Sequence, residues 1–132
     1  MMFEETTQGI VVRVEPRFQM QESDPAARRF VWSYRVEIEN RSRETVRLIN
    51  REWSITDAAG QHQEIQGAGV VGQQPLLRPG ERFQYTSAAP LRGPSGVMVG
   101  RYEMERAITG ERFFIAIPAF ALDSPLQSKL AN

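Results

Sequence analysis

The sequence predicts one all-β domain, an antiparallel β-sandwich of seven to eight strands. Apolar and polar residues alternate with a period of two along most of the chain, which is typical of strands with one buried face. Gly, Pro, Asn and Asp interrupt this alternation roughly every ten to fifteen residues, as turns do. No stretch has the periodicity of a ten-residue helix, and parallel strands need helical crossovers, so we expect antiparallel sheets. A closed barrel is the second architecture that fits this pattern.

The clearest strand is residues 30–40, FVWSYRVEIEN, where apolar side chains occupy every second position. Residues 9–18 alternate in the same way. Pro16 lies late in that run and cannot donate to a strand ladder, so it predicts an edge strand or a β-bulge. The remaining alternation and turn signals place further strands within residues 46–56, 62–71, 82–90, 97–106 and 112–120.

Length and composition fit a single soluble domain. The chain has 132 residues and a mass of 15.0 kDa. We expect one domain over residues 1–132, with a core over about residues 9–122 and a loosely ordered tail over residues 123–132. Sixteen basic residues balance sixteen acidic ones, so no overall field attracts nucleic acid or an anionic membrane.

The expected compartment follows from three features of the sequence. There is no Cys, which excludes disulfides and thiolate chemistry. The N-terminus carries Glu4 and Glu5 instead of a basic segment, so we expect no signal peptide. The longest apolar run is about half a membrane span. We therefore predict a cytoplasmic protein that has no contact with a membrane.

Residues 67–72, GAGVVG, match the letters of the dinucleotide-binding fingerprint. That fingerprint binds pyrophosphate where it opens a helix, because the helix N-terminus supplies amides and a positive dipole end. Pro75, Pro79 and Gly80 prevent such a helix here, so the Rossmann interpretation fails. A kinked strand is the favoured interpretation, and contact with an anion or nucleotide is the alternative. The candidate ligand or partner loop comprises Gly67, Gly69, Val70, Val71, Gly72, Gln74 and Pro75.

A larger set of spaced residues resembles the ApaG family of small bacterial proteins, whose domain also occurs in eukaryotic F-box proteins. The resemblance extends from Gly9 to Leu122. One position departs from the family pattern, since Glu52 stands where His is frequent, and this weakens any metal role there. The matching elements are Trp53 with Ile55–Thr56–Asp57, Gly60, the run 67–72, Gln74–Pro75, Pro79–Gly80, Phe83, Tyr85–Thr86–Ser87, Pro94, Gly96, Met98, Gly100, Tyr102 and residues 117–120.

The resemblance implies an immunoglobulin- or fibronectin-type-III-like sandwich, in agreement with the alternation. It also implies an association with cobalt and magnesium resistance or efflux. The family's gene often neighbours a diadenosine-tetraphosphate hydrolase, and its eukaryotic domains look like protein-interaction modules. The family brings no catalytic residues, so the resemblance assigns none to this chain.

The sequence offers little for catalysis. His62 is the only His, and a lone His after a turn is far more often solvated than a base or ligand. A Ser-His-acid arrangement would have to use it, yet GPSG at residues 93–96 lacks the spacing of a nucleophile elbow. We therefore predict no catalytic residues, no cofactor and no enzyme activity.

Two acidic pairs are the only candidates for metal ligands. Glu37 and Glu39 share one strand face, as do Glu103 and Glu105, and paired carboxylates can bind Mg²⁺ or Co²⁺. The favoured interpretation is a solvated face whose charge is balanced by cross-strand pairing, and we predict no metal site. The arginines expected to balance these pairs are their sequence neighbours Arg35, Arg101 and Arg106.

Aromatic and basic residues raise the question of nucleic acid. Aromatic side chains can stack with bases, but their alternation with polar residues favours packing in the core. The densest basic stretches, Arg28–Arg29 and residues 41–47, are mixed with acids, so we expect no nucleic-acid partner. The aromatic residues in question are Trp32, Trp53, Tyr34, Phe83 and Tyr85.

Two functional hypotheses follow. The first is a non-enzymatic protein-interaction module with an unidentified protein partner, because a sandwich offers sheet faces, edge strands and long loops. A homodimer through an edge strand is one form of it. The second is binding of a nucleotide, dinucleoside polyphosphate or pyrophosphate by the amides of residues 67–72.

Overall fold

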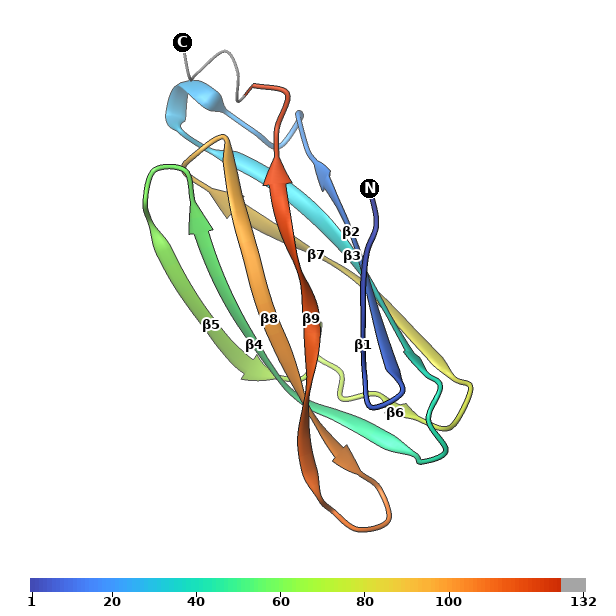
Figure 1. The fold of residues 1–132 in the computed structure, drawn as a ribbon. Coiled ribbons are helices and arrows are strands. Elements are labelled where there is room, and N and C mark those ends of the chain that lie inside the picture. The colour runs from blue at the N-terminus through green and yellow to red at the C-terminus, as the bar shows by residue number, and fades with distance from the viewer. Residues whose placement is uncertain (127–132) are drawn as a thin grey trace.

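Two antiparallel sheets pack face to face in the computed structural model, which describes residues 1–126 (Figure 1). The four-stranded sheet has the order β1-β2-β3-β7, and the five-stranded sheet has the order β5-β4-β8-β9 with β6 paired to β4. This architecture confirms the predicted sandwich. The strands are β1 (Phe3–Thr7), β2 (Ile10–Phe18), β3 (Phe30–Asn40), β4 (Val46–Asp57), β5 (His62–Ala68), β6 (Leu76–Leu77), β7 (Arg82–Leu91), β8 (Ser95–Arg106) and β9 (Arg112–Asp123), with one 3-10 turn, η1 (Pro25–Ala27).

The core lies between the sheets and is aromatic at its centre. The Trp53 ring packs edge-on against Tyr34 and Phe120, with centroid distances of 5.6 and 6.0 Å. Trp32, Trp53, Tyr34 and Tyr85 are buried, and Phe83 packs against them from a half-buried position. These aromatic side chains therefore belong to the core, as the alternation favoured.

The strand expected over residues 62–71 ends at Ala68. It stops there because Gly69 has a φ of +62° and Val71 a φ of +42°, and a strand cannot continue through left-handed backbone. In β1, Phe3 is followed by four polar residues and there is no alternation, yet the strand pairs with β2 from Phe3 opposite Val14 onward. Backbone pairing, which sequence patterning does not reveal, defines this strand.

Pro16 lies where β2 has a neighbour on one side. It stands opposite Tyr34 of β3, while β1 reaches only as far as Val14. β2 is a central strand, but at Pro16 it has a neighbour on one side only, like an edge strand. The missing N–H of Pro16 therefore leaves no gap in a ladder.

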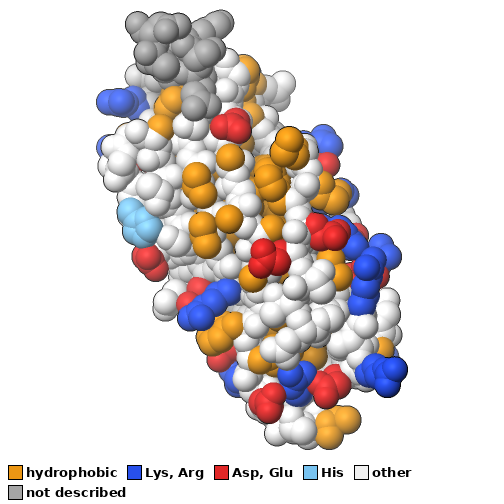
Figure 2. Space-filling model, in the orientation of Figure 1, with side chains coloured by type: hydrophobic (Ala, Val, Ile, Leu, Met, Phe, Trp, Pro, Cys, Tyr) orange, Lys and Arg blue, Asp and Glu red, His pale blue; other side chains and the backbone are white. Residues whose placement is uncertain are grey.

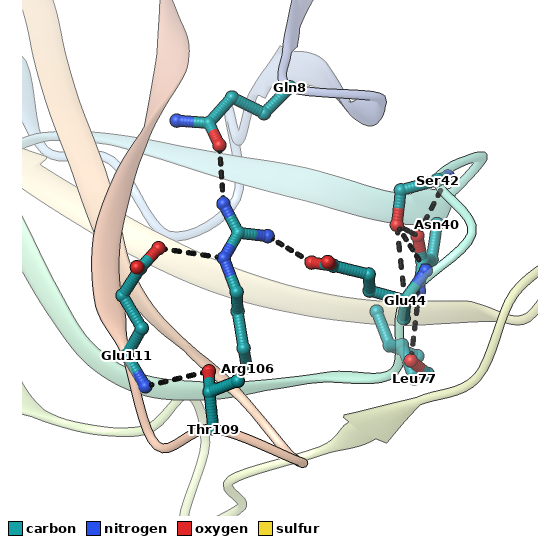
Figure 3. Close-up of polar contacts among 8 residues, drawn as sticks. All are labelled: Gln8, Asn40, Ser42, Glu44, Leu77, Arg106, Thr109 and Glu111. Atoms are coloured by element: carbon teal, nitrogen blue, oxygen red, sulfur yellow. Dashed lines mark hydrogen bonds and ion pairs between the residues drawn. The ribbon is translucent and has the colours of Figure 1, made fainter.

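One end of the sandwich is held together by Arg106 of β8 (Figure 3). Its guanidinium donates to Glu111 at 2.8 Å, to Glu44 and to Gln8 at 2.7 Å. Beside it, the buried Asn40 amide donates to the carbonyls of Glu44 and Leu77 (Figure 3). Three connections, β1–β2, β3–β4 and β8–β9, are thereby joined to one side chain.

The two sides of the sandwich differ. The β1 and β9 edges approach each other, where Ala116 N donates to Thr7 Oγ1 at 3.1 Å. On the other side β5 and β7 each pair with one strand only within residues 1–126. Of the tail predicted from residue 123, Asp123 ends β9 and Leu126 packs against the core, while residues 127–132 lie outside the described residues.

Candidate interaction surface

An apolar strip lies on the outer face of the five-stranded sheet. Val97 and Val99 of β8 are 47% and 49% exposed, and Phe114 of β9 is 40% exposed. Ala121 stands opposite Val97 in the pairing of these strands and is also exposed. Figure 2 shows hydrophobic side chains gathered over this part of the face. Several exposed apolar side chains on one sheet face are typical of interaction surfaces.

Charged side chains border the apolar strip. The Arg101 guanidinium lies 3.7 Å from the centroid of the Phe114 ring, within the range of a cation–π contact. The same guanidinium pairs with Glu52 across the strands at 3.2 Å. The border therefore holds both signs of charge.

A shallow depression of about 210 Å³ lies between the apolar strip and β5. Gly100 forms part of its floor at a register shift between β8 and β9. A Cβ at Gly100 would lie 2.6 Å from the carbonyl oxygen of Glu52 and 2.7 Å from the Trp53 ring, so only glycine fits there. Ser54, Glu64 and Val99 complete its wall.

The register of β4 and β5 brings four polar side chains together beside this depression. His62 stands opposite Thr56, and Glu64 opposite Ser54. Nδ1 of His62 lies 2.8 Å from Thr56 Oγ1, while Nε2 lies 2.9 Å from Glu64 Oε1 and 3.3 Å from Ser54 Oγ. Ser54 and Thr56 give no signal in the sequence, because only the hairpin register places them beside His62.

This cluster lacks the surroundings of a hydrolase site. Ser54 and Glu64 both meet the same nitrogen of His62, whereas a catalytic imidazole bridges its nucleophile and its acid through two nitrogens. Thr56 does lie within hydrogen-bond distance of the other nitrogen, Nδ1. The side chains of His62 and Glu64 are, however, 49% and 68% exposed. Exposed contacts of this kind are weakened by competition with water.

The acidic pairs are balanced by arginines that lie outside their own strands. Glu37 accepts from Arg13 at 2.8 Å and Glu39 accepts from the same guanidinium at 3.0 Å. The guanidinium of Arg41, followed in size of effect by that of Arg13, lowers the pKa of Glu39. The expectation of charge balance holds, but Arg13 and Arg41, together with Arg82 and Arg112, take the places predicted for Arg35, Arg101 and Arg106.

The GAGVVG run forms a tight hairpin turn anchored to β4. Val70 and Gln73 exchange two backbone hydrogen bonds of 2.8 and 2.9 Å. Between them, Val71 and Gly72 both have positive φ, +42° and +80°, as the central pair of a type I′ turn requires. Val70 is buried and Val71 is 54% exposed.

The same turn uses its polar groups internally. Gly69 N donates to the carbonyl of Ile49 at 2.8 Å, and that carbonyl also accepts from Gln74 Nε2 at 2.9 Å. Leu48 N donates to the Pro75 carbonyl at 3.0 Å. Ile49 lies at a register shift between β4 and β8, which leaves its carbonyl available to the turn. The seven predicted loop residues therefore lie together, and several bind β4.

Within residues 1–126, no three His, Cys, Asp or Glu side chains come together as a metal-binding group. In the same range no helix is long and apolar enough to cross a bilayer.

The fold and the spaced residues on these strands match one known family. The ApaG domain family model matches residues 20–106. The chain belongs to the ApaG family. Protein ApaG of Rhodospirillum centenum is 56% identical over 124 residues, which cover 94% of this chain and 95% of that protein. Protein ApaG of Parvibaculum lavamentivorans is 55% identical over 131 residues, which cover 99% of this chain and 100% of that protein.

A solved structure supports this fold. The crystal structure of an ApaA protein from Bordetella pertussis is 43% identical to this chain and superimposes with a TM-score of 0.84. The superposition covers 88% of this chain and 94% of the other. The sandwich is therefore shared with a structure of clearly related sequence.

Proposed function

We propose that this protein is a non-enzymatic interaction module whose protein partner docks on the apolar strip. The exposure of Val97, Val99 and Phe114 on two paired strands is the observation that supports this proposal. An isolated exposed apolar residue needs no explanation, whereas three on one sheet face favour a docking site.

The borders of the apolar strip indicate the chemistry of the partner. The Glu52–Arg101 pair favours a partner surface with an apolar centre and charged groups of both signs at its rim. The expected cytoplasmic location comes from the sequence itself, and the association with cobalt and magnesium resistance comes from the family resemblance. We propose that the partner, and not this chain, handles the cation.

Binding of a nucleotide or pyrophosphate by residues 67–72 is the weaker proposal. A phosphate site needs several free amides pointing to one place. The amides of Gly69 and Val70 already donate to the carbonyls of Ile49 and Gln73. An NMR titration of the ¹⁵N-labelled protein with ADP tests this alternative, since specific binding would shift the amides of Gly67, Gly69 and Gly72 together.

The interaction proposal is tested with a charged substitution inside the apolar strip. We expect V99D to abolish capture of a partner from a native lysate, because an unpaired carboxylate would be buried in the interface. I108D is the matched control, since Ile108 is 94% exposed and lies in the β8–β9 turn outside the apolar strip.

The affinity of each variant is then measured with the purified partner by calorimetry. V99D that binds as tightly as I108D would overturn the proposal. If the captured protein is a second copy of this chain, sedimentation of the wild type shows a dimer that V99D dissociates.

A further inference from the structure

A basic depression of about 260 Å³ lies at the end of the sandwich opposite the glycine turn. Arg28 and Arg29 reach it from the turn that follows η1, and Arg92 reaches it from the residue after β7. Gln61, just before β5, and Gln63, near the start of that strand, also line it. The rest of the lining, Pro90 and Leu91, is apolar, and none of the lining residues is acidic.

The three arginines of this depression differ from most others in the chain. None of Arg28, Arg29 and Arg92 has a carboxylate oxygen within ion-pair distance among the described residues. The chain has no net charge overall, so three uncompensated charges at one depression form a local positive field. The arginines that do pair with Glu are Arg13, Arg17, Arg35, Arg41, Arg82, Arg101, Arg106 and Arg112.

The backbone beneath two of these arginines is fixed. Asp24 and Arg29 exchange backbone hydrogen bonds of 2.7 and 2.9 Å. Arg28 has a φ of +55° and donates from its amide to the carbonyl of Pro25 at 3.0 Å. Left-handed backbone is unfavourable for Arg, and the turn holds it there. The two arginines therefore reach the depression from a defined turn and not from a flexible loop.

We infer that this depression binds a pyrophosphate group, either free or as part of a nucleotide. Guanidinium groups match phosphate oxygens in paired hydrogen bonds and stay charged at any physiological pH. Three guanidinium groups suit an anion with several negative charges better than they suit a single carboxylate. The side-chain amides of Gln61 and Gln63 can donate to the remaining oxygens. This site is distinct from both the apolar strip and the glycine turn.

The inference is tested by calorimetry of the full chain with pyrophosphate at 50 and 150 mM NaCl. We expect saturable binding that weakens with salt and weakens at least tenfold in R29Q/R92Q. The matched control is R43Q/R78Q, which removes the same charge from two exposed arginines outside the depression. Binding by this control should stay within twofold of the wild type. Thermal unfolding of both variants shows that they are folded.

Titrations with ADP and adenosine distinguish free pyrophosphate from a nucleotide as the ligand. ADP that binds more tightly than pyrophosphate, while adenosine does not bind, indicates a nucleotide, and equal affinities indicate free pyrophosphate. Absence of saturable pyrophosphate binding at millimolar concentration overturns the inference. Equal losses in R29Q/R92Q and R43Q/R78Q also overturn it, because the effect would then be one of overall charge.

Discussion

The guanidinium of Arg51 occupies the space that a side chain at Gly67 would need. A Cβ at Gly67 would lie 2.8 Å from Nη2 of Arg51. From this position Arg51 Nη1 donates to the carbonyls of Ala68 and Gly69, at 3.1 and 2.9 Å. The first glycine of the GAGVVG run therefore makes room for an arginine that binds the hairpin turn to β4, which is a structural role.

Gly69→Ala should be the most damaging alanine substitution in this run. A Cβ at Gly69 would lie 2.2 Å from the carbonyl oxygen of Gln73, at a φ of +62°, so the turn backbone must move. Gly72→Ala meets no atom within 4 Å and has only its positive φ of +80° to accommodate, at a cost of about 1 kcal/mol. We expect Gly69→Ala to lower the free energy of unfolding by at least twice that amount.

Urea unfolding of both variants measures these costs. Equal losses for Gly69→Ala and Gly72→Ala would show that backbone conformation alone, and not the contact with Gln73, governs the turn.

Gly67→Ala should act through Arg51. The new Cβ displaces a flexible guanidinium, so the expected loss is that of two hydrogen bonds from a charged donor, about 1–3 kcal/mol. In an Arg51→Ala background those bonds are already gone, and Gly67→Ala should then cost almost nothing. A double-mutant cycle followed by urea unfolding measures this coupling. Additive losses would mean that Gly67 is required for a reason unrelated to Arg51.

Local patterning predicted the strands but not the contacts between them. The alternation in residues 30–40 identified β3 because one face of that strand is buried along its whole length. The approach of Arg51 to Gly67 and of His62 to Thr56 depends on the β4–β5 register, which follows from turn geometry and not from composition. The arginines of the basic depression likewise come from separate segments, so only the folded chain brings them together.

The GAGVVG turn shows a second limit of sequence patterning. Val is disfavoured in left-handed backbone because it is branched at Cβ, so the pair Val71–Gly72 gives no turn signal. The sequence accordingly favoured a kinked strand, where the structure has a hairpin turn with Val71 at a φ of +42°.

Val71→Asn should stabilise the protein. Asn tolerates left-handed backbone and is preferred at the first central position of a type I′ turn, so the gain should be about 1 kcal/mol. For a domain of this size the Tm should rise by roughly 4 °C, which calorimetry measures. Val70→Asn is the control and should destabilise, because Val70 is 1% exposed and contributes to the core. A Tm that does not rise in Val71→Asn would show that the side chain of Val71 makes a compensating contact.

Alkaline titration should reveal the burial of the tyrosines. The chain has three, Tyr34, Tyr85 and Tyr102, and burial raises the pKa of each. Tyr85 and Tyr102 also share a short hydrogen bond between their hydroxyls. A raised pKa in the folded state means that their stabilising effect is complete below the unfolded pKa of about 10 and is lost as the pH rises above it.

Absorbance at 295 nm measures this titration. The native protein at pH 10 should contain little tyrosinate, and absorbance should then rise cooperatively as the protein unfolds. In concentrated urea the same groups should be half ionised near pH 10. A gradual native titration centred near pH 10 would contradict the burial of at least one tyrosine.

Arg106→Gln should loosen the end of the sandwich drawn in Figure 3. The substitution removes the ion pairs with Glu44 and Glu111 and the contact with the Phe113 ring, whose centroid lies 4.2 Å from the guanidinium carbon. Because these partners lie on separate connections, the Tm should fall more than in Arg112→Gln, whose partners Glu103 and Glu105 belong to the neighbouring strand.

Two further comparisons separate charge from geometry at this end. Arg106→Lys keeps the charge but loses the planar fork that reaches several acceptors at once, so its Tm should lie between those of Arg106→Gln and the wild type. The difference between wild type and Arg106→Gln should shrink in 1 M NaCl, because exposed ion pairs are screened there. A difference that does not respond to salt would assign the effect to the packing of Arg106 on Phe113.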